Sequence, residues 1–473
     1  MKKLFGTDGI RAVAGQPPLD PPTVYAIGRA LAHSLIRTSA QAPQPDLMLV
    51  GQDTPQPTPW TEIAPSPRVL LGMDTRESST WIAANLTAGL KDGGATVESA
   101  GVITTPAIAF LAREHGFAAG VVISASHNPW QDNGIKLFGP DGYKLPDATE
   151  LEVEEEIFRQ LATNHQPTTD NQQPEVNESD RAEYIQFLLA AVPDLSLDNR
   201  RIVVDCANGA ASSVAPQLFT GLGGEVIITH ASPDGRNINE HCGALHPEIV
   251  AAEVVAQKAS MGITFDGDAD RALFADEHGN VVNGDAVLLL AGRHLKALNL
   301  LTNDTIVATT MSNMGLEAAL KISGIKMLRA PVGDKYVLEQ MLSTGAALGG
   351  EQSGHIIFSG RSTTGDGLLT ALLVLDIIHR SGKSLAELTA DLKTFPQVII
   401  NVKVREKKPL DQIPSVAAAI LAAEQALADS GRVVIRYSGT EALARVMIEA
   451  ESEPLMRHHS EAIAHAIRTE LGV

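Results

Sequence analysis

The sequence predicts an α/β protein built from several domains, and three observations support this fold class. At 473 residues the chain is longer than one hydrophobic core usually organises, so more than one domain is expected. Short apolar runs rich in β-branched residues alternate with longer helical patterns, as they do in βαβ units. The polar, turn-forming motifs come directly after strand-like runs, which is where such sheets bind ligands.

The expected strands are buried apolar runs, and the expected helices are segments whose apolar residues recur at helical spacing. The strands are Val69–Met73, Val121–Ser124, Arg201–Asp205, Glu225–Thr229, Gly262–Phe265 and Thr305–Thr309. The helices are Thr23–Ile36, Ser179–Ala191 and Gly367–His379. After Thr394–Gln397 the pattern changes to strand, helix, strand, strand, helix, which predicts a compact α+β unit. Those last elements are Val398–Val404, Ile413–Leu427, Val433–Arg436, Arg445–Glu451 and Glu453–Leu471.

Two polar segments interrupt these patterns. Thr38–Pro67 is rich in Pro, Gln, Thr and Ser and is predicted to be a surface insertion. Thr163–Glu175 lacks periodicity and indicates a first domain boundary. The expected domains are 1–175, 176–283, 284–394 and 395–473.

Charge and cysteine content exclude several classes of function. The net charge is −19, from 37 Lys and Arg against 56 Asp and Glu, so we expect no nucleic-acid or anionic-membrane partner. The two cysteines, Cys206 and Cys242, have no CxxC spacing and indicate neither a disulfide framework nor a zinc site. No signal peptide and no membrane-spanning run is recognised, so a cytoplasmic protein is expected. An anionic substrate would need a local positive site.

The first motif, Ser124-Ala125-Ser126-His127-Asn128-Pro129, follows a predicted strand. Small and turn-forming residues at that point make a tight loop in which a serine can face a ligand. A turn in which these side chains only cap the backbone is an equally good interpretation. No GxSxG elbow surrounds Ser126, so a phosphorylated serine is the functional alternative. Lys136, ten residues later, is then a candidate for moving a proton.

The second motif is Asp266-Gly267-Asp268-Ala269-Asp270-Arg271, again directly after a strand. Carboxylates at alternate positions of an extended chain project to one side, and hard oxygen ligands at this density favour Mg²⁺. An EF-hand loop is excluded because it requires glycine where Arg271 stands. A solvated acidic turn remains an alternative, although three like charges this close repel unless a cation joins them.

Two further loops suit a sugar and a phosphate. In Gly349–His355, glycines around Glu351, Ser353 and His355 suggest backbone close to a ligand, although a plain connecting loop fits as well. In Arg436–Glu441, a Ser-Gly-Thr turn with two arginines, the second being Arg445, suits a phosphate better than an ordinary surface turn. Arg11 and Arg76 follow turns near the N-terminus and individually look like ordinary surface arginines.

Together and in this order, the four motifs resemble those of the α-D-phosphohexomutase family. The resemblance runs from Phe5 to Glu449. It implies three similar mixed α/β domains plus a small C-terminal α+β domain around a central cleft, each domain giving one loop. It also implies that a phosphate moves between two hydroxyls of one hexose, through phospho-Ser126 and a 1,6-bisphosphate intermediate.

The resemblance carries roles onto matching residues. Ser126 would hold the phosphoryl group, and Asp266, Asp268 and Asp270 would bind one Mg²⁺ together with an oxygen on Ser126. Lys136 would be the general acid and base, with His127, Arg271 and Arg11 beside the phosphate. Glu351, Ser353 and His355 would hold sugar hydroxyls. The non-reacting phosphate would be held by Arg436, Ser438, Gly439, Thr440 and Arg445.

Several strings point to the bacterial branch of the family that interconverts glucosamine 6-phosphate and glucosamine 1-phosphate for UDP-N-acetylglucosamine and cell-wall precursor synthesis. They include Phe5–Arg11, Asp205–Ala210 and Gln352 in the sugar loop. The resemblance then implies a small phosphosugar substrate, and glucosamine 1,6-bisphosphate or glucose 1,6-bisphosphate as activator. It leaves the oligomeric state open, with a homodimer as one option. A branch acting on mannose and glucose phosphates, a non-catalytic phosphosugar-binding protein and a plain phosphatase are the alternatives.

Overall fold

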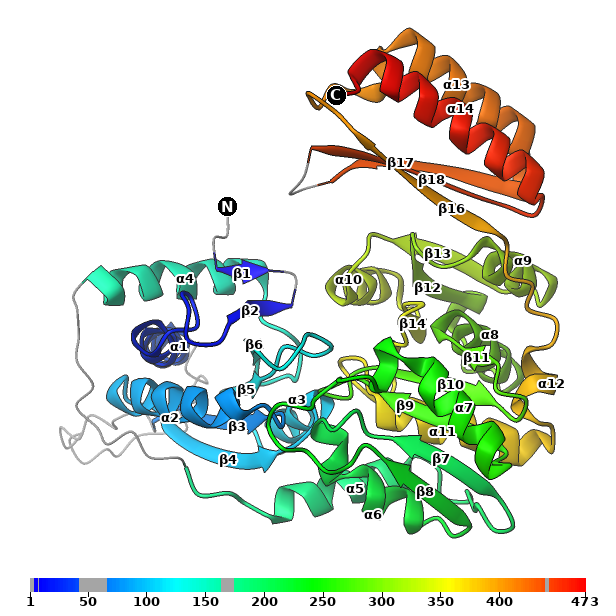
Figure 1. Ribbon diagram of the computed structural model, residues 1–473. Helices are drawn as coiled ribbons and strands as arrows, with labels where there is room; N and C mark the ends of the chain where they lie inside the picture. The colour runs from blue at the N-terminus through cyan, green and yellow to red at the C-terminus, as the bar shows by residue number, and fades with distance from the viewer. Residues whose placement is uncertain (1–3, 7, 42–65, 163–173, 439–441) are drawn as a thin grey trace, which may run out of the picture. The chain divides into compact units, whose positions relative to one another are not determined.

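The computed structural model describes residues 4–6, 8–41, 66–162, 174–438 and 442–473 (Figure 1). The described chain divides into two compact units. The first comprises residues up to Thr310 together with Leu328–Leu388, and the second comprises Met311–Met327 and Thr389–Val473. Each unit is described by itself.

The first sheet of the larger unit has six strands in the order β1-β2-β6-β5-β3-β4. Strands β5, β3 and β4 are parallel, whereas β6 and β2 run antiparallel to their neighbours. All residues of β5 are buried, as expected for a parallel strand that is covered on both faces. The strands are β1 (Phe5–Gly6), β2 (Gly9–Val13), β3 (Arg68–Met73), β4 (Thr96–Val102), β5 (Ala119–Ile123) and β6 (Asp132–Phe138). The helices are α1 (Pro21–Gln41), α2 (Glu77–Asp92), α3 (Thr105–Glu114) and α4 (Asp147–Ala162).

Close packing of α1 on α2 depends on glycine. A Cβ on Gly28 would lie 2.3 Å from the Leu86 carbonyl oxygen, and one on Gly89 would lie 2.0 Å from that of Tyr25. The two helices, drawn in blue in Figure 1, therefore approach backbone to backbone.

The second sheet has the order β11-β10-β9-β7-β8, with β7 parallel to β8 and β9, and β10 antiparallel to β9. Its strands are β7 (Arg201–Asp205), β8 (Glu225–Thr229), β9 (Met261–Phe265), β10 (Ala272–Asp276) and β11 (Val281–Val282). Its helices are α5 (Ser179–Ala190), α6 (Ala215–Thr220) and α7 (Pro247–Gln257).

The third sheet has the order β13-β12-β14-β15, with β12 parallel to β14. Its strands are β12 (Thr305–Thr309), β13 (Lys326–Ala330), β14 (Leu348–Gly350) and β15 (Ile356–Phe358). The helices of this part of the chain are α8 (Gly284–Ala297), α9 (Met314–Ile322), α10 (Asp334–Thr344), α11 (Gly367–Ser381) and α12 (Leu385–Thr389).

The C-terminal part of the second unit is a three-stranded antiparallel sheet, β16-β18-β17, packed against two helices (Figure 1). Its own apolar core includes Val402, Val446 and Ile463. The elements are β16 (Gln397–Lys403), α13 (Pro414–Leu427), β17 (Gly431–Tyr437), β18 (Leu443–Ala450) and α14 (Glu453–Leu471). The expected α+β unit is confirmed, and its last helix has the expected bounds.

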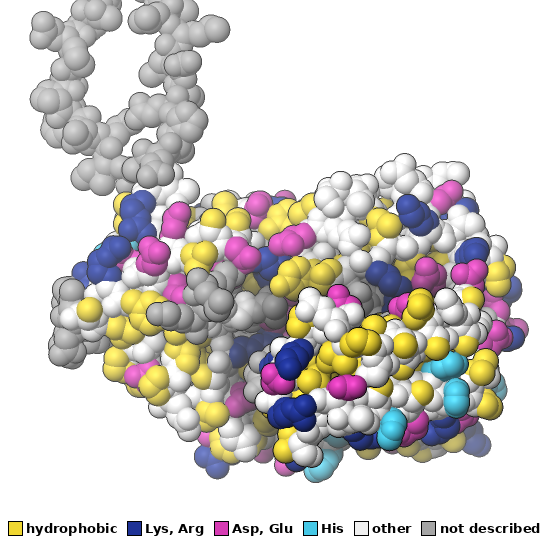
Figure 2. Space-filling model, turned by 90° about the horizontal axis from the view of Figure 1, so that it is seen from above, with side chains coloured by type: hydrophobic (Ala, Val, Ile, Leu, Met, Phe, Trp, Pro, Cys, Tyr) yellow, Lys and Arg dark blue, Asp and Glu magenta, His cyan; other side chains and the backbone are white. Residues whose placement is uncertain are grey.

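The α/β fold class is confirmed, and most expected elements differ from the observed ones by one or two residues. Helix α1 is longer than expected because it continues to Gln41, so the segment Thr38–Gln41 is helix rather than the start of the polar insertion. The rest of that insertion up to residue 65, and residues 163–173, lie outside the described residues. None of the described helices is both long enough and apolar enough to cross a bilayer. On the face in Figure 2, basic and acidic side chains are interspersed.

Candidate active site

Three segments of the larger unit bring their polar side chains together at strand ends. Ser126 follows β5, the aspartates follow β9, and Lys136 lies on β6. Ser126 Oγ donates a hydrogen bond to Asp266 Oδ2 at 2.6 Å, across 140 positions of sequence. The serine is 1% exposed and its backbone is left-handed, with φ +53°. The Ser124 hydroxyl accepts the Ser126 N–H at 2.9 Å, so the turn is tied down locally.

The three aspartates form a buried acidic cluster. One carboxylate oxygen from each of Asp266, Asp268 and Asp270 lies within 4.8 Å of the others. Burial, and then the charges of Asp270 and Asp268, raise the pKa of Asp266 to about 8. Asp268 Oδ1 is buried without a hydrogen-bond partner among the described residues. The site is compatible with a metal ion held by oxygen ligands.

Lys136 faces this cluster from β6. Its ammonium lies 2.7 Å from Asp268 Oδ2, 3.1 Å from Asp270 Oδ2 and 3.1 Å from Asp8 Oδ2. Burial disfavours the charged form, but these carboxylates outweigh it and raise the pKa of Lys136 well above its ordinary value. The register explains the placement, because Lys136 pairs with Val122 on β5, four residues before Ser126.

Two residues without a role in the sequence interpretation complete the charge network. Asp8, in the β1–β2 turn, pairs with Arg11 and accepts from Lys144 Nζ at 2.5 Å. Lys144 also pairs with Asp334 at the start of α10, so its ammonium joins the first and third sheets. Asp8 lies in the string Phe5–Arg11, which carries part of the family resemblance. No local pattern distinguishes Lys144 from a surface lysine.

Arg271 and His127 border the serine and the aspartates. Arg271 Nε lies 3.8 Å from Asp270 Oδ1 and 4.0 Å from Asp266 Oδ2, and its side chain is 22% exposed. His127 Nδ1 lies 3.2 Å from Ser126 Oγ. Burial, and then the positive charges of Arg271 and Arg11, lower the pKa of His127 to about 4, so the ring is neutral near pH 7.

Glu351 and Ser353 lie together in the loop after β14. Glu351 Oε2 accepts the Ser353 hydroxyl at 3.0 Å, and Oε1 accepts the Gly333 N–H at 3.0 Å. Next to them, Gln352 donates to Asp285 Oδ2 at 3.2 Å. A Cβ on Gly284 would lie 2.0 Å from the Glu351 carbonyl oxygen, so the loop is packed tightly against the start of α8.

His355 is placed differently from these two residues. It is 2% exposed, its Nε2 accepts the Gly365 N–H at 3.1 Å, and its Nδ1 faces Asp270 Oδ1 at 3.5 Å. Both ring nitrogens are thus directed at protein atoms. The geometry favours a role in holding the third sheet's loops against the acidic cluster over the expected contact with a sugar hydroxyl.

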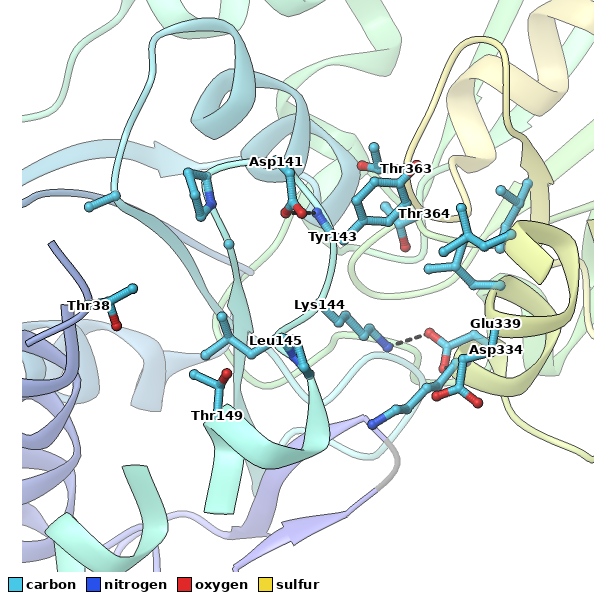
Figure 3. Close-up of a pocket in the computed structure, with 18 of the residues that line it drawn as sticks. Thr38, Asp141, Tyr143, Lys144, Leu145, Thr149, Asp334, Glu339, Thr363 and Thr364 are labelled. Atoms are coloured by element: carbon cyan, nitrogen blue, oxygen red, sulfur yellow. Dashed lines mark hydrogen bonds and ion pairs between the residues drawn. The ribbon is translucent and has the colours of Figure 1, made fainter. Parts of the chain in front are cut away.

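A cavity of about 710 Å³ adjoins the charge network through Lys144, Asp334 and His355 (Figure 3). Lys144 and Asp334, which form an ion pair with each other, both line it. Much of its lining is apolar, from α1, from the segment 139–146 and from α10.

The arginines of the expected phosphate loop lie in the second unit. Arg436 on β17 and Arg445 on β18 are direct cross-strand partners, so the two basic residues lie side by side on the sheet. Ser438, 7% exposed, donates its N–H to the Leu443 carbonyl oxygen at 2.9 Å. Gly439 and Thr440 lie outside the described residues.

Family models of phosphoglucomutase/phosphomannomutase match four successive parts of the chain. The α/β/α domains I, II and III match residues 60–164, 182–279 and 283–395, and the C-terminal domain matches residues 399–466. The chain belongs to the phosphoglucomutase/phosphomannomutase family, the α-D-phosphohexomutases. The family expected from the motifs is confirmed.

Curated relatives in this phosphohexomutase family match the chain over its whole length. The phosphoglucosamine mutase of Koribacter versatilis (strain Ellin345) is 56% identical, covering 100% of this chain and 98% of that protein. The phosphoglucosamine mutase of Solibacter usitatus (strain Ellin6076) is 51% identical, covering 100% and 99%.

Solved structures share the phosphohexomutase fold. A phosphoglucomutase/phosphomannomutase family protein from Burkholderia thailandensis matches with TM-score 0.76 and 23% identity over 100% of both chains. The N-acetylphosphoglucosamine mutase of Aspergillus fumigatus, in complex with GlcNAc-6P and magnesium, matches with TM-score 0.55 and 20% identity, covering 78% of this chain and 93% of that one.

Proposed function

We propose that this phosphohexomutase interconverts glucosamine 6-phosphate and glucosamine 1-phosphate, feeding UDP-N-acetylglucosamine and cell-wall precursor synthesis. The observation that carries the proposal is the 2.6 Å hydrogen bond from Ser126 Oγ to Asp266, inside an acidic cluster faced by Lys136. The choice of amino sugar rests on full-length relatives, 56% and 51% identical, that are named phosphoglucosamine mutase.

Ser126 carries the phosphoryl group in this proposal. Asp266, Asp268 and Asp270 would hold Mg²⁺ together with an oxygen on Ser126, and both the unpartnered Asp268 Oδ1 and the raised pKa of Asp266 fit a cation there. When bound, Mg²⁺ neutralises charge that develops on the phosphoryl oxygens. Glucosamine 1,6-bisphosphate or glucose 1,6-bisphosphate supplies the first phosphate.

Lys136 moves the proton in each transfer. The substrate oxygen forms its bond to phosphorus as the bond from phosphorus to Ser126 Oγ breaks. Lys136, kept as an ammonium by the carboxylates around it, donates a proton to Oγ as that bond breaks and then takes the proton of the substrate hydroxyl, so that it ends as an ammonium again. Ser126 ends with a hydroxyl, whose hydrogen bond to Asp266 is the one observed. The bisphosphate then turns round, and its other phosphate passes to Ser126 by the same steps in reverse. Arg11, Arg271 and neutral His127 border the phosphoryl position and limit the charge that builds up there.

The remaining loops hold the substrate. Glu351 and Ser353, already hydrogen-bonded to each other, accept and donate to sugar hydroxyls. The cross-strand partners Arg436 and Arg445, with Ser438, Gly439 and Thr440, hold the phosphate that is not reacting. We propose that the four loops belong to domains bounded at 1–175, 176–283, 284–394 and 395–473.

The first experiment locates the phosphate. The protein is incubated with glucose 1,6-bisphosphate and analysed by intact-protein and peptide mass spectrometry, with Ser126→Ala and the exposed-site control Ser343→Ala alongside. We expect one phosphate per chain, mapped to Ser126, in the wild type and in Ser343→Ala, and none in Ser126→Ala. A phosphate mapped to another residue contradicts the mechanism.

The second experiment tests substrate and reaction class. We expect kcat/KM to be highest for glucosamine phosphates, no net release of inorganic phosphate, and a loss of about 100-fold or more in Ser126→Ala. A preference for mannose 1-phosphate would move the protein to the other branch of the family. Release of inorganic phosphate would make it a phosphatase, and a loss of less than about tenfold would make Ser126 dispensable.

A further inference from the structure

Two side chains that have no role in the mechanism above donate hydrogen bonds to backbone carbonyl groups of the loop that holds Ser126. Arg76 Nη2 donates to the carbonyl oxygens of Ser126 and Asn128, at 3.1 and 2.6 Å. Asn239 Nδ2 donates to the same two oxygens, at 3.0 and 3.2 Å. Each carbonyl thus accepts from one guanidinium and one amide, which come from segments 163 positions apart in sequence (239 minus 76).

Arg76 is held rigidly for this contact. It is 1% exposed, so the expectation of an ordinary surface arginine is wrong. Asp74 pairs with its Nη1 and also accepts the Arg76 N–H and the Ser79 hydroxyl, both at 3.0 Å. Because a guanidinium is planar, fixing one nitrogen also fixes the direction of the other.

Asn239 is held by the strained turns of the second sheet. Its own backbone is left-handed, with φ +58°, and its N–H donates to the carbonyl oxygen of Ala207, whose φ is +54°. Asp205 ties that turn down by accepting the N–H groups of Ala207 and Gly243, both at 2.9 Å. The amide of Asn239 therefore comes from a rigid frame in a different sheet from Ser126.

These four hydrogen bonds hold a backbone conformation that L-residues rarely adopt. Ser126 has φ +53°, which is costly for a non-glycine residue unless its surroundings impose it. Rotation of the peptide that carries the Ser126 carbonyl would break the two hydrogen bonds that this oxygen accepts. The side that faces Gly267 is also closed, because a Cβ there would lie 2.4 Å from the Ser126 carbonyl oxygen. The orientation of Oγ toward Asp266 is a consequence of this backbone conformation.

We propose that Arg76 and Asn239 are positioning residues: together they hold the Ser126 peptide in its left-handed conformation, so that Oγ is aligned for phosphoryl transfer. The inference rests on the proposed function, since it takes Ser126 as the phosphoryl carrier. Neither side chain acts on the phosphate; both act through the backbone.

The test measures how fast and how completely Ser126 is phosphorylated by glucose 1,6-bisphosphate, by quench and intact-protein mass spectrometry. Asn239→Asp keeps the shape and tolerates the left-handed backbone but loses the donor. Arg76→Lys keeps a positive charge beside Asp74 but loses the planar fork. We expect the rate constant to fall by about tenfold or more in each variant, while phosphate still reaches one per chain. In the double variant the loss should be smaller than the product of the single losses, because both side chains act on the same two oxygens.

The matched control is Thr75→Val, which removes the 2.6 Å hydrogen bond from Thr75 Oγ1 to the Asn208 carbonyl oxygen but does not touch the serine loop. We expect its rate to stay within about threefold of the wild type. Rates near wild type in both test variants overturn the inference, and so does an equal loss in Thr75→Val. A third outcome is that fewer chains take a phosphate but those that do take it at the wild-type rate. These residues would then act only in folding, and the inference would be overturned. If wild-type Ser126 takes no phosphate, it is the proposed function that fails.

Discussion

Lys136 Nζ lies 2.7 Å from Asp268 Oδ2, although the two residues are 132 positions apart, Lys136 on β6 of the first sheet and Asp268 in the loop after β9 of the second. Both side chains are 1% exposed. A buried charge is tolerated only beside a partner, so each of these groups depends on the other for its place in the core. The lysine proposed to move the proton is therefore also a structural cation.

Replacing Lys136 by Met tests this double role. The variant leaves Asp8, Asp268 and Asp270 without the ammonium that they face, and we expect unfolding free energy to fall by about 3–5 kcal/mol. Activity should fall by about 10²–10⁴-fold. Urea unfolding and the mutase assay measure the two effects, with Lys91→Met on the exposed side of α2 as control. Loss of stability alone would restrict Lys136 to a structural role.

Asp268→Asn tests metal binding apart from activity. A cation that binds only the folded protein raises its unfolding free energy, by about 2.7 kcal/mol at a concentration 100 times its Kd. We expect Mg²⁺ to raise the Tm of the wild type and EDTA to reverse the rise. Asp268→Asn should abolish the response, whereas Asp429→Asn, at an exposed position in the second unit, should keep it. An equal Mg²⁺ response in both variants would place the ion elsewhere.

Two lysines at the rim of the cavity differ in how deeply their ion pairs are buried. Lys144, 14% exposed, pairs with Asp8 and Asp334, which are 19% and 15% exposed, whereas Lys335 pairs with Asp147, which is 62% exposed. We expect Lys144→Met to cost about 3 kcal/mol or more in urea unfolding. Lys335→Met should cost about 1 kcal/mol or less. Equal costs would show that the Lys144 network adds little beyond an ordinary surface pair.

Gly267→Ala tests the close approach of the loop Asp266–Arg271 to the loop that holds Ser126. The added Cβ would lie 2.4 Å from the Ser126 carbonyl oxygen and 2.9 Å from the Ile238 side chain, so the loops must separate. We expect about a 100-fold loss of kcat/KM, since small displacements at a reacting centre are costly. Gly360→Ala, where a Cβ meets nothing within 4 Å, is the control and should be fully active. An active Gly267→Ala would show that the loops move apart freely.

Asp366 gives the protein a pH dependence that can be isolated by mutation. It caps α11 through the Leu369 N–H, accepts the Tyr184 hydroxyl at 2.9 Å, and burial raises its pKa to about 6. Between about pH 4 and 6 the folded protein keeps a proton that the unfolded chain has released, so this contribution to stability falls as pH rises. The full change is about 3 kcal/mol. We expect the difference in unfolding free energy between wild type and Asp366→Asn, measured by urea titration, to change by this amount between about pH 4 and 6. A difference that does not change with pH would contradict this prediction.

The parts of the fold that could be predicted are those set by local pattern. Strands such as Arg201–Asp205 are short apolar runs, and the motifs with small and acidic residues come directly after such runs. Arg76 could not be placed, because its burial depends on Asp74 and on two carbonyls some fifty residues away. The position of Lys144 could not be predicted for the same reason, because its partners Asp8 and Asp334 lie 136 and 190 positions away. Ion pairs between residues so far apart in sequence form only when the sheets pack against each other. The spacing of apolar residues along the chain does not predict that packing.

The bond between Ser126 and Asp266 spans 140 positions, and this has a consequence for refolding. Contacts between distant parts of a chain form late, because the loop that joins them must first lose its conformational entropy. Helices such as α2 regain their circular dichroism from local contacts, whereas the reactive centre exists only once the first two sheets have docked. After dilution from denaturant, enzymatic activity should therefore return more slowly than helical signal. The interval between the two would time the docking of one domain onto the other.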